Sequence, residues 1–155
     1  MLALFLSISC LPSRDTLAGT WATRTDEVVR CDGVSYTVEM AINEVQDFEY
    51  TGQLLFRYTK EVSGGDFYAN LLYEFQALQP VVAGSQEVYF YDIFWSDLGC
   101  KTIYSDGTEQ AGGCQANGLD TSDFEEKIGD LTMDFNGIDR LVIDDGNCQG
   151  AIYRE

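Results

Sequence analysis

Apolar and polar residues alternate along most of this chain, which is typical of β-strands with one buried face. The first clear alternation covers residues 34–43, and its apolar members are Val34, Tyr36, Val38, Met40 and Ile42. Similar runs cover residues 50–59 and 67–75. Residues 87–95 are almost continuously apolar, as expected for a strand covered on both faces. The pattern therefore predicts a protein built mainly from antiparallel strands.

Short turn signals separate these runs and continue to the end of the chain. Asp32-Gly33 ends a first strand region over residues 17–31, and a weaker strand is expected over residues 101–104. Asn136-Gly137 and Asp145-Gly146 favour two-residue hairpin turns, because both central residues of such turns need positive φ. These two turns separate the last three expected strands, which cover residues 131–135, 138–144 and 148–154.

Only residues 121–128 favour a helix. Ser122 and Glu125 have the spacing of a capping box, in which each side chain satisfies an orphan backbone donor. No long helical period and no internal repeat accompany them. The fold class is therefore all-β, an antiparallel meander closed as a small up-and-down β-barrel with one short helix. The alternative is the same meander folded as a β-sandwich.

The length of 155 residues suits one domain with a substantial core. Hydrophobic residues make up 45% of the chain, and the 13% of aromatic residues favours β structure. We expect a signal segment over residues 1–9, a tether over residues 10–16 and a single β-barrel domain over residues 17–155.

The first ten residues are typical of an export signal. Residues 1–9 form an apolar run that is too short to cross a bilayer and ends in small residues before Cys10. The run Leu6-Ser7-Ile8-Ser9-Cys10 resembles the lipobox of bacterial lipoproteins, with Ser7 where that family prefers leucine. The resemblance implies cleavage before Cys10, acylation of its side chain and an anchored position in the cell envelope. The alternative is a core strand that contains a free cysteine.

Removing Cys10 leaves four cysteines, and an even number in an exported chain suggests two disulfides. Cys100 and Cys114 bracket a local glycine-rich excursion. Cys31 ends the first strand region, and Cys148 begins the last one. We therefore expect the pairs Cys100–Cys114 and Cys31–Cys148. A zinc site is the competing interpretation, but no Cys-x-x-Cys spacing and no histidine support it.

The chain is strongly acidic, with 26 Asp and Glu against 9 Lys and Arg, a net charge of −17 and a pI near 4.1. Such a field repels phosphate backbones and anionic lipid headgroups, so nucleic acid is not expected as a partner. Membrane attachment is expected only through the N-terminal lipid. Solubility explains the acidity better than cation binding does, although the turn Asp144-Asp145-Gly146-Asn147 offers oxygen ligands for weak Ca²⁺ binding.

The sequence points away from catalysis. Histidine is absent, which removes the usual base near neutral pH and the commonest neutral metal ligand. No nucleophile elbow, phosphate-binding glycine loop or zinc-protease motif is present. The acidic doublets are poor acid/base pairs, because neighbouring residues on a strand point to opposite faces. We predict a non-enzymatic protein with no catalytic residues, no cofactor and no metal.

A resemblance joins the two ends of the predicted domain. Gly19-Thr20-Trp21 at the start of the first strand, a meander, and Arg154 on the last strand resemble the lipocalin and fatty-acid-binding superfamily. In that superfamily the tryptophan closes one end of an up-and-down barrel, and a basic residue from the final strand packs over it. The resemblance implies these structural roles for Gly19, Trp21 and Arg154. The alternative is a core tryptophan in an unrelated β-sandwich.

Hairpin register gives a different result for the last strand. With two-residue turns at Asn136-Gly137 and Asp145-Gly146, Arg140 lies opposite Met133 and shares the inner face, whereas Arg154 points outward. A bulge at Gly150 would reverse the final strand. An inward Arg140 among aromatic rings could hold a carboxylate, as inward arginines do in fatty-acid-binding proteins. Alternatively, Arg140 pairs with a neighbouring aspartate at the barrel rim.

Two functions fit these features. The first is a lipocalin-like barrel that binds a small apolar or amphipathic ligand with Arg140 and six aromatic residues: Tyr36, Tyr50, Phe56, Tyr58, Tyr73 and Phe75. The second is an envelope module with a packed interior, whose surface meets another protein. Interior volume separates them, because ligand carriers leave a cavity of roughly 300 Å³ or more.

Overall fold

The computed structural model describes residues 17–79, 87–119, 131–135, 139–144, 146 and 148–155, with the side chains of three residues in β6 left aside. Its elements are β1 (Gly19–Ala22), β2 (Val29–Cys31), β3 (Val34–Gln46), β4 (Glu49–Val62), β5 (Gly65–Leu78), β6 (Glu87–Tyr104), β7 (Glu109–Ala111), the 3₁₀ turn η1 (Gln115–Asn117), β8 (Leu131–Phe135), β9 (Arg140–Asp144) and β10 (Cys148–Arg154). The expected helix over residues 121–128, the segments before residue 17 and Asn136-Gly137 lie outside the described residues.

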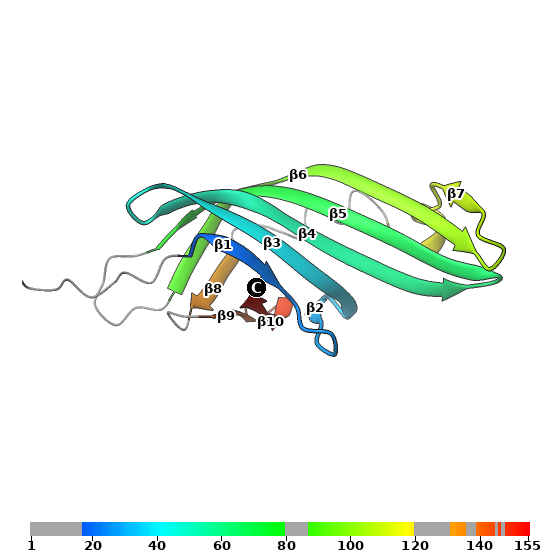
Figure 1. Cartoon of the computed structure of the whole chain (residues 1–155), viewed down its shortest axis with the longest axis horizontal. Helices are drawn as coiled ribbons and strands as arrows, with labels where there is room; N and C mark the ends of the chain where they lie inside the picture. The colour runs from blue at the N-terminus through cyan, green and yellow to red at the C-terminus, as the bar shows by residue number, and fades with distance from the viewer. Residues whose placement is uncertain (1–16, 80–86, 120–130, 136–138, 145, 147) are drawn as a thin grey trace, which may run out of the picture.

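The sheet closes on itself as an eight-strand antiparallel barrel, which confirms the predicted fold class (Figure 1). Strands β3, β4, β5, β6, β8, β9 and β10 follow one another as neighbours around it. The eighth position, between β10 and β3, is shared by β1 and β2. The small β7 lies outside this ring on the edge of β6. Closure satisfies the backbone groups that an open sheet would leave at its two edges.

The expected first strand over residues 17–31 is interrupted between β1 and β2. The excursion contains the charged run Arg24-Thr25-Asp26-Glu27, which is largely exposed. Thr23 keeps the excursion attached to β3, since its backbone N–H donates to the carbonyl of Val38 at 2.9 Å. The backbone N–H of Val38 in turn donates to the Thr23 hydroxyl at 3.1 Å. A polar loop therefore leaves the sheet without leaving these β3 groups unpaired.

Strand β6 joins two regions that the sequence pattern separated, residues 87–95 and 101–104. It pairs with β5 along almost its whole length, and register shifts absorb the extra residues in its middle. Asp92 lies beside one of these shifts and adopts a positive φ of 48°. The strand therefore continues through the polar residues Ser96 and Asp97, because bulges keep the rest of the ladder paired.

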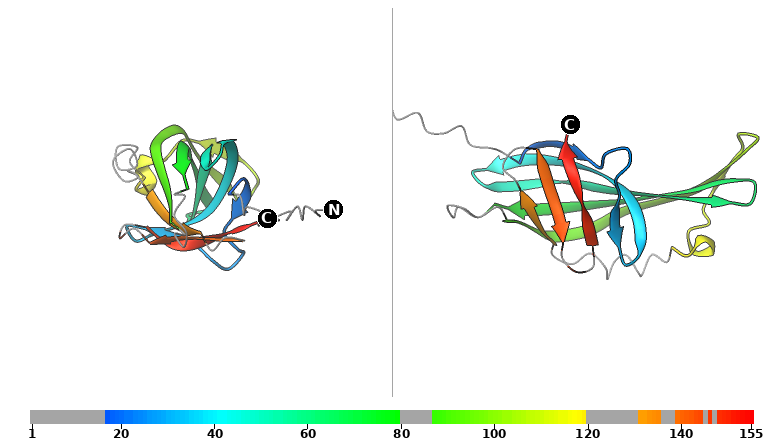
Figure 2. Two further views of the ribbon diagram at one scale, coloured as in Figure 1. Left: turned by 90° about the vertical axis from the view of Figure 1, so that its left-hand side faces the viewer. Right: turned by 90° about the horizontal axis from the view of Figure 1, so that it is seen from below.

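Three strands continue past the rest of the barrel as a projecting arm (Figures 1 and 2). The pairing of β3 with β4 reaches no further than Thr37 and Arg57. Beyond that point β4 pairs only with β5, which pairs in turn with β6, and β7 lies at the edge of the arm. The turn of Asp32-Gly33 and the aromatic residues next to it therefore lie where the arm leaves the barrel.

The last two hairpins are longer than predicted, and this corrects the placement of Arg140. Phe135 pairs with Leu141, so Met133 lies opposite Ile143 instead of Arg140. The partner of Met133 is thus shifted by three residues along β9. Because three is an odd number, the shift turns every side chain of β9 to the face opposite the predicted one. Leu141 and Ile143 are fully buried, whereas Arg140 is exposed. The inward Arg140 was therefore a wrong prediction, and its cause is the length of the first connection.

The same shift places Arg154 on the inner side. The pairing of β9 with β10 runs without a break from Asp144–Gln149 to Arg140–Tyr153, so no bulge at Gly150 is involved. Tyr153 consequently shares the outer face with Arg140, and Arg154 shares the inner face with Ile152. The face implied by the superfamily resemblance is the one that the structure adopts.

Both predicted disulfides are present. Cys31 and Cys148 are direct partners across β2 and β10 and join residues 117 positions apart at the closure of the barrel. Cys100 on β6 is bonded to Cys114, 14 positions away, at the start of η1. Two disulfides are consistent with an oxidising compartment outside the cytoplasm.

The two disulfides should differ in what they contribute to stability. Loop-closure entropy gives upper values of about 5 kcal/mol for Cys31–Cys148 and about 3 kcal/mol for Cys100–Cys114. We expect the Cys31→Ala/Cys148→Ala pair to lower the free energy of unfolding more than the Cys100→Ala/Cys114→Ala pair, measured by urea unfolding. An equal or smaller loss for the first pair would show that closure of the barrel does not depend on the long-range bond.

Candidate functional site

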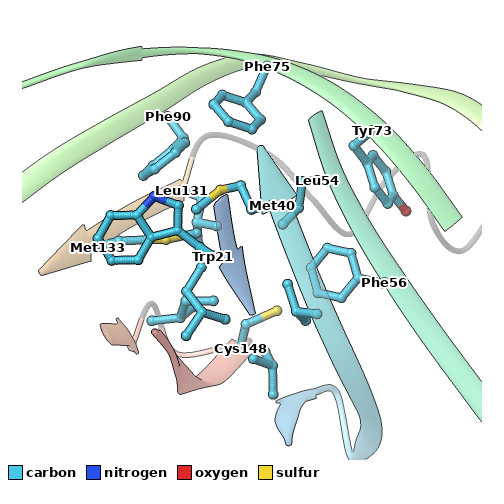
Figure 3. Packing of buried hydrophobic residues seen from close by; sticks show 14 of the residues in the cluster. Trp21, Met40, Leu54, Phe56, Tyr73, Phe75, Phe90, Leu131, Met133 and Cys148 are labelled. Carbon is cyan, nitrogen blue, oxygen red and sulfur yellow. The ribbon is translucent and has the colours of Figure 1, made fainter. Parts of the chain in front are cut away.

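One end of the barrel interior is closed around Trp21. Its indole ring is fully buried, and Nε1 donates to the carbonyl of Leu17 at 3.0 Å. Phe135 packs edge-on against the indole with ring centroids 5.9 Å apart. Figure 3 shows the indole beside Leu131 and Met133 in the packed core. This end is therefore filled by the protein's own side chains.

Arg154 covers the tryptophan in the way that the resemblance implied. Its guanidinium carbon lies 4.4 Å from the centroid of the Trp21 ring, within the range of a cation–π interaction. Nη1 also donates to the carbonyl of Ala18 at 2.8 Å. Gly19 has a φ of +139°, and an added Cβ would lie 3.1 Å from Nη1. Gly19, Trp21 and Arg154 thus form one structural unit that joins β1 to β10.

The other end of the interior contains a cluster of aromatic rings, which we call the ring cluster: Tyr36, Phe56, Tyr58, Phe67 and Tyr73. These residues come from the neighbouring strands β3, β4 and β5, and neighbouring rings have centroid distances of 5.4–6.3 Å, mostly edge to face. Tyr58 is half-buried, and the other four are buried. The cluster lies beside the Asp32-Gly33 turn, at the end of the barrel opposite Trp21.

The two remaining predicted aromatic residues belong to a separate group. Tyr50 is buried, and its hydroxyl donates to Oε1 of Gln79 at 3.2 Å. Phe75 packs against Phe90 with centroids 5.0 Å apart, and its ring lies over Gly52. All six predicted aromatic residues therefore share the inner face, but only Tyr36, Phe56, Tyr58 and Tyr73 belong to the ring cluster.

Phe67 belongs to the ring cluster and was not among the predicted site residues. The signal for it was present in the sequence, because Phe67 has the same parity along its strand as Tyr73 and Phe75. Its centroid lies 6.3 Å from that of Tyr58. The sequence predicted the strand that contains Phe67 correctly, but the predicted site included only Tyr73 and Phe75 from that strand.

Arg140 does not reach this interior. Its guanidinium carbon lies 6.0 Å from the centroid of Tyr153 on the outside of the barrel, and Arg24 covers the same ring at 3.7 Å. Two outer hollows of about 530 Å³ adjoin Tyr153, one lined by Arg24 and one by Arg140. Acidic residues line both hollows. Glu27 belongs to both, Asp26 and Asp139 belong to the hollow with Arg24, and Asp144 belongs to the hollow with Arg140. These hollows are of mixed charge and do not form a simple anion site.

Two tyrosines of the ring cluster, Tyr36 and Tyr73, are held in their neutral form. Burial, followed by Tyr58 and Asp32, raises the pKa of Tyr36 from 10.0 to about 12. Burial and the neighbouring Tyr36 also raise the pKa of Tyr73. The Tyr73 hydroxyl is buried and has no hydrogen-bond partner in the described part of the chain. The cluster thus combines apolar ring surface with one unsatisfied polar group.

Metal binding has no support in the part of the chain that the structure describes, where no group of three Cys, Asp or Glu side chains could hold an ion. Of the turn considered for Ca²⁺, Asp145 and Asn147 lie outside that part. Asp144 accepts a hydrogen bond from Nε2 of Gln149 at 3.3 Å. Among the described residues, no helix is long and apolar enough to cross a membrane.

A scan against protein-family models found no match, and searches of curated proteins and of solved structures found no significant similarity. The properties of this site therefore follow from its own geometry.

The unit of Gly19, Trp21 and Arg154 can be tested with a pair of glycine variants. We expect Gly19→Ala to lower the free energy of unfolding by about 1–3 kcal/mol, because alanine is strained at positive φ and would crowd the guanidinium. Gly99→Ala is the matched control, since Gly99 has no atom within 4 Å of an added Cβ and no positive φ. Equal urea midpoints for the two variants would contradict this role of Gly19.

Proposed function

We propose that this protein is a non-catalytic, extracytoplasmic, lipocalin-like lipoprotein that binds a small apolar or amphipathic ligand inside its barrel. The observation that supports this most is the difference between the two ends of the interior. Trp21, Phe135 and Arg154 fill one end, and aromatic rings with a half-buried Tyr58 line the other. A closed floor below an aromatic wall suits a ligand that enters from the end next to the arm.

The composition of the wall supports binding more than catalysis. Rings from β3, β4 and β5 present apolar surface, and the phenols of Tyr36 and Tyr73 stay neutral well above neutral pH. The chain contains no histidine to serve as a base. Rigid rings give a large contact area with little loss of conformational entropy on binding, which suits a carrier.

A second function is favoured by the tight contacts between the rings. Centroid distances of 5.0–6.3 Å are ordinary for packed aromatic pairs, and narrow barrels are often filled by their own side chains. On this alternative the protein is a packed envelope module that acts through its outer surface on another protein. The two functions differ in whether any small molecule binds saturably.

The first function can be tested by displacement of a fluorescent amphiphile from the purified, disulfide-bonded protein. We expect one saturable site, and Tyr58→Ala should weaken binding by about five- to tenfold, because it removes a ring at the edge of the cluster. Tyr68→Ala is the matched control, since Tyr68 lies on β5 with opposite parity and faces outward. The absence of saturable binding by the wild type would favour the packed module.

The proposed location rests on the N-terminal sequence together with the disulfides. Cys10 lies outside the described residues, and its lipobox-like context is the reason to propose an acylated N-terminus. We expect the mature chain in a membrane fraction to begin at an acylated Cys10, as measured by intact mass. Cys10→Ser should leave the chain unacylated. An unmodified Cys10, or a chain that retains Met1, would contradict the anchor.

A further inference from the structure

The Tyr73 hydroxyl is a buried polar group that the described part of the chain leaves unsatisfied. Tyr73 is 2% exposed, and its hydroxyl has no hydrogen-bond partner among the residues that the structure describes. An unsatisfied buried hydroxyl costs on the order of 1–3 kcal/mol. Tyr50, the other fully buried tyrosine, avoids this cost by donating to Gln79. Tyr73 therefore differs from Tyr50, whose equally buried hydroxyl has a hydrogen-bond acceptor.

The surroundings of this hydroxyl are rings. Phe56 packs at right angles to Tyr73 with centroids 5.9 Å apart, and Figure 3 shows the two side by side at the end of the core away from Trp21. Tyr36 packs against Phe56 at 5.4 Å, and its phenol is close enough to act electrostatically on Tyr73. Aromatic faces carry negative potential, so they attract cations and disfavour anions.

A carboxylate lies near one side of the ring cluster. Asp32, which is exposed in the turn before β3, contributes to the raised pKa of the Tyr36 phenol, after burial and Tyr58. Burial, the largest cause of both raised pKa values, disfavours a buried charge of either sign, whereas the Asp32 carboxylate disfavours only a negative charge beside Tyr36. The net charge of −17 adds a field that raises the local concentration of cations around the protein.

The arginines that could have balanced a carboxylate, Arg140 and Arg154 among the described residues, lie elsewhere. Arg140 is on the outer surface, and Arg154 is bound to Ala18 and Trp21 at the opposite end of the barrel. Lys60 lies two residues beyond Tyr58 on β4 and has the same parity, but its side chain is exposed on the arm. A buried carboxylate needs a paired cation, whereas an ammonium would meet rings, an acceptor hydroxyl and Asp32.

We propose that the polar end of the ligand is an organic ammonium group, which donates a hydrogen bond to the Tyr73 hydroxyl while the ring cluster and Asp32 stabilise its charge. This inference rests on the proposed function, because it needs a ligand inside the barrel. It replaces the carboxylate that the predicted position of Arg140 had favoured. The ligand class is a primary amine with an apolar body.

The test compares three amphiphiles with the same chain, namely decylammonium, decanoate and decanol, by calorimetric titration of the disulfide-bonded protein below their micelle concentrations. Decylammonium should bind most tightly, at one site. Tyr73→Phe should weaken decylammonium by at least about tenfold, since it removes a charge-assisted hydrogen bond. Asp32→Asn should weaken it by a few-fold, and Lys60→Met should not weaken it.

Tyr50→Phe is the matched control, because it also removes a phenol hydroxyl from the inner face but leaves the ring cluster intact. Its decylammonium affinity should equal that of the wild type. Equal losses in Tyr50→Phe and Tyr73→Phe would overturn the assignment to Tyr73, as would tighter binding of decanoate or decanol. Failure of all three amphiphiles to bind would instead overturn the proposed function.

Stability without ligand gives a second measurement. Tyr73→Phe should raise the urea midpoint of the free protein, because it removes an unsatisfied hydroxyl and keeps the ring. Tyr50→Phe should lower the midpoint, since it breaks a hydrogen bond. A lowered midpoint for Tyr73→Phe would show that its hydroxyl is already paired in the free protein, and it would overturn the proposal.

Discussion

The pairing of the last strand with the first is the constraint on which the rest of this barrel depends. β10 pairs with both β1 and β2, which are separated by a charged excursion. A different interaction stabilises each of these two pairings. Cys31 and Cys148 join β2 to β10 covalently. Arg154 joins β10 to β1 through the Trp21 ring and the Ala18 carbonyl. Without these contacts, β10 on one side and β1 and β2 on the other would become exposed edges, and the continuous inner face would open to water.

Closure fixes the direction of every side chain in the ring of strands, because parity is shared between neighbours. The inner face that begins at Trp21 continues through Met40, Leu54 and Tyr73 to the strands beyond. The interior is divided along its length into a floor around Trp21 and Phe135 and a phenol-rich wall next to the arm. In the floor the Arg154 guanidinium contacts a ring and a carbonyl, whereas the wall has the neutral phenols of Tyr36 and Tyr73 and a nearby carboxylate. The two ends therefore present different chemistry to anything that enters.

Burial of the side chains determines the electrostatics of the interior more than ion pairs do. The described core contains hydrophobic and aromatic residues, and its Tyr36 and Tyr73 remain protonated because a phenolate would lose its hydration. The described charged residues stay outside this core, where Arg57–Glu39 and Lys101–Glu109 form exposed ion pairs of small energetic weight. An interior of this kind selects a ligand mainly by its shape and by one or two polar groups.

The sequence by itself determined the strands, the closed meander, both disulfides and the inward aromatic residues, because alternation and cysteine position are local or nearly local signals. It also linked Gly19 and Trp21 to Arg154 through a resemblance, although the hairpin argument pointed the other way. Only the tertiary structure decided the register of β9. Asn-Gly favours a tight turn locally, but the longer connection buries Leu141 and Ile143 and leaves the Arg140 guanidinium in water. The hydrophobic gain over the whole strand outweighs the preference of two turn residues, and an odd shift in register then reverses every side chain that follows.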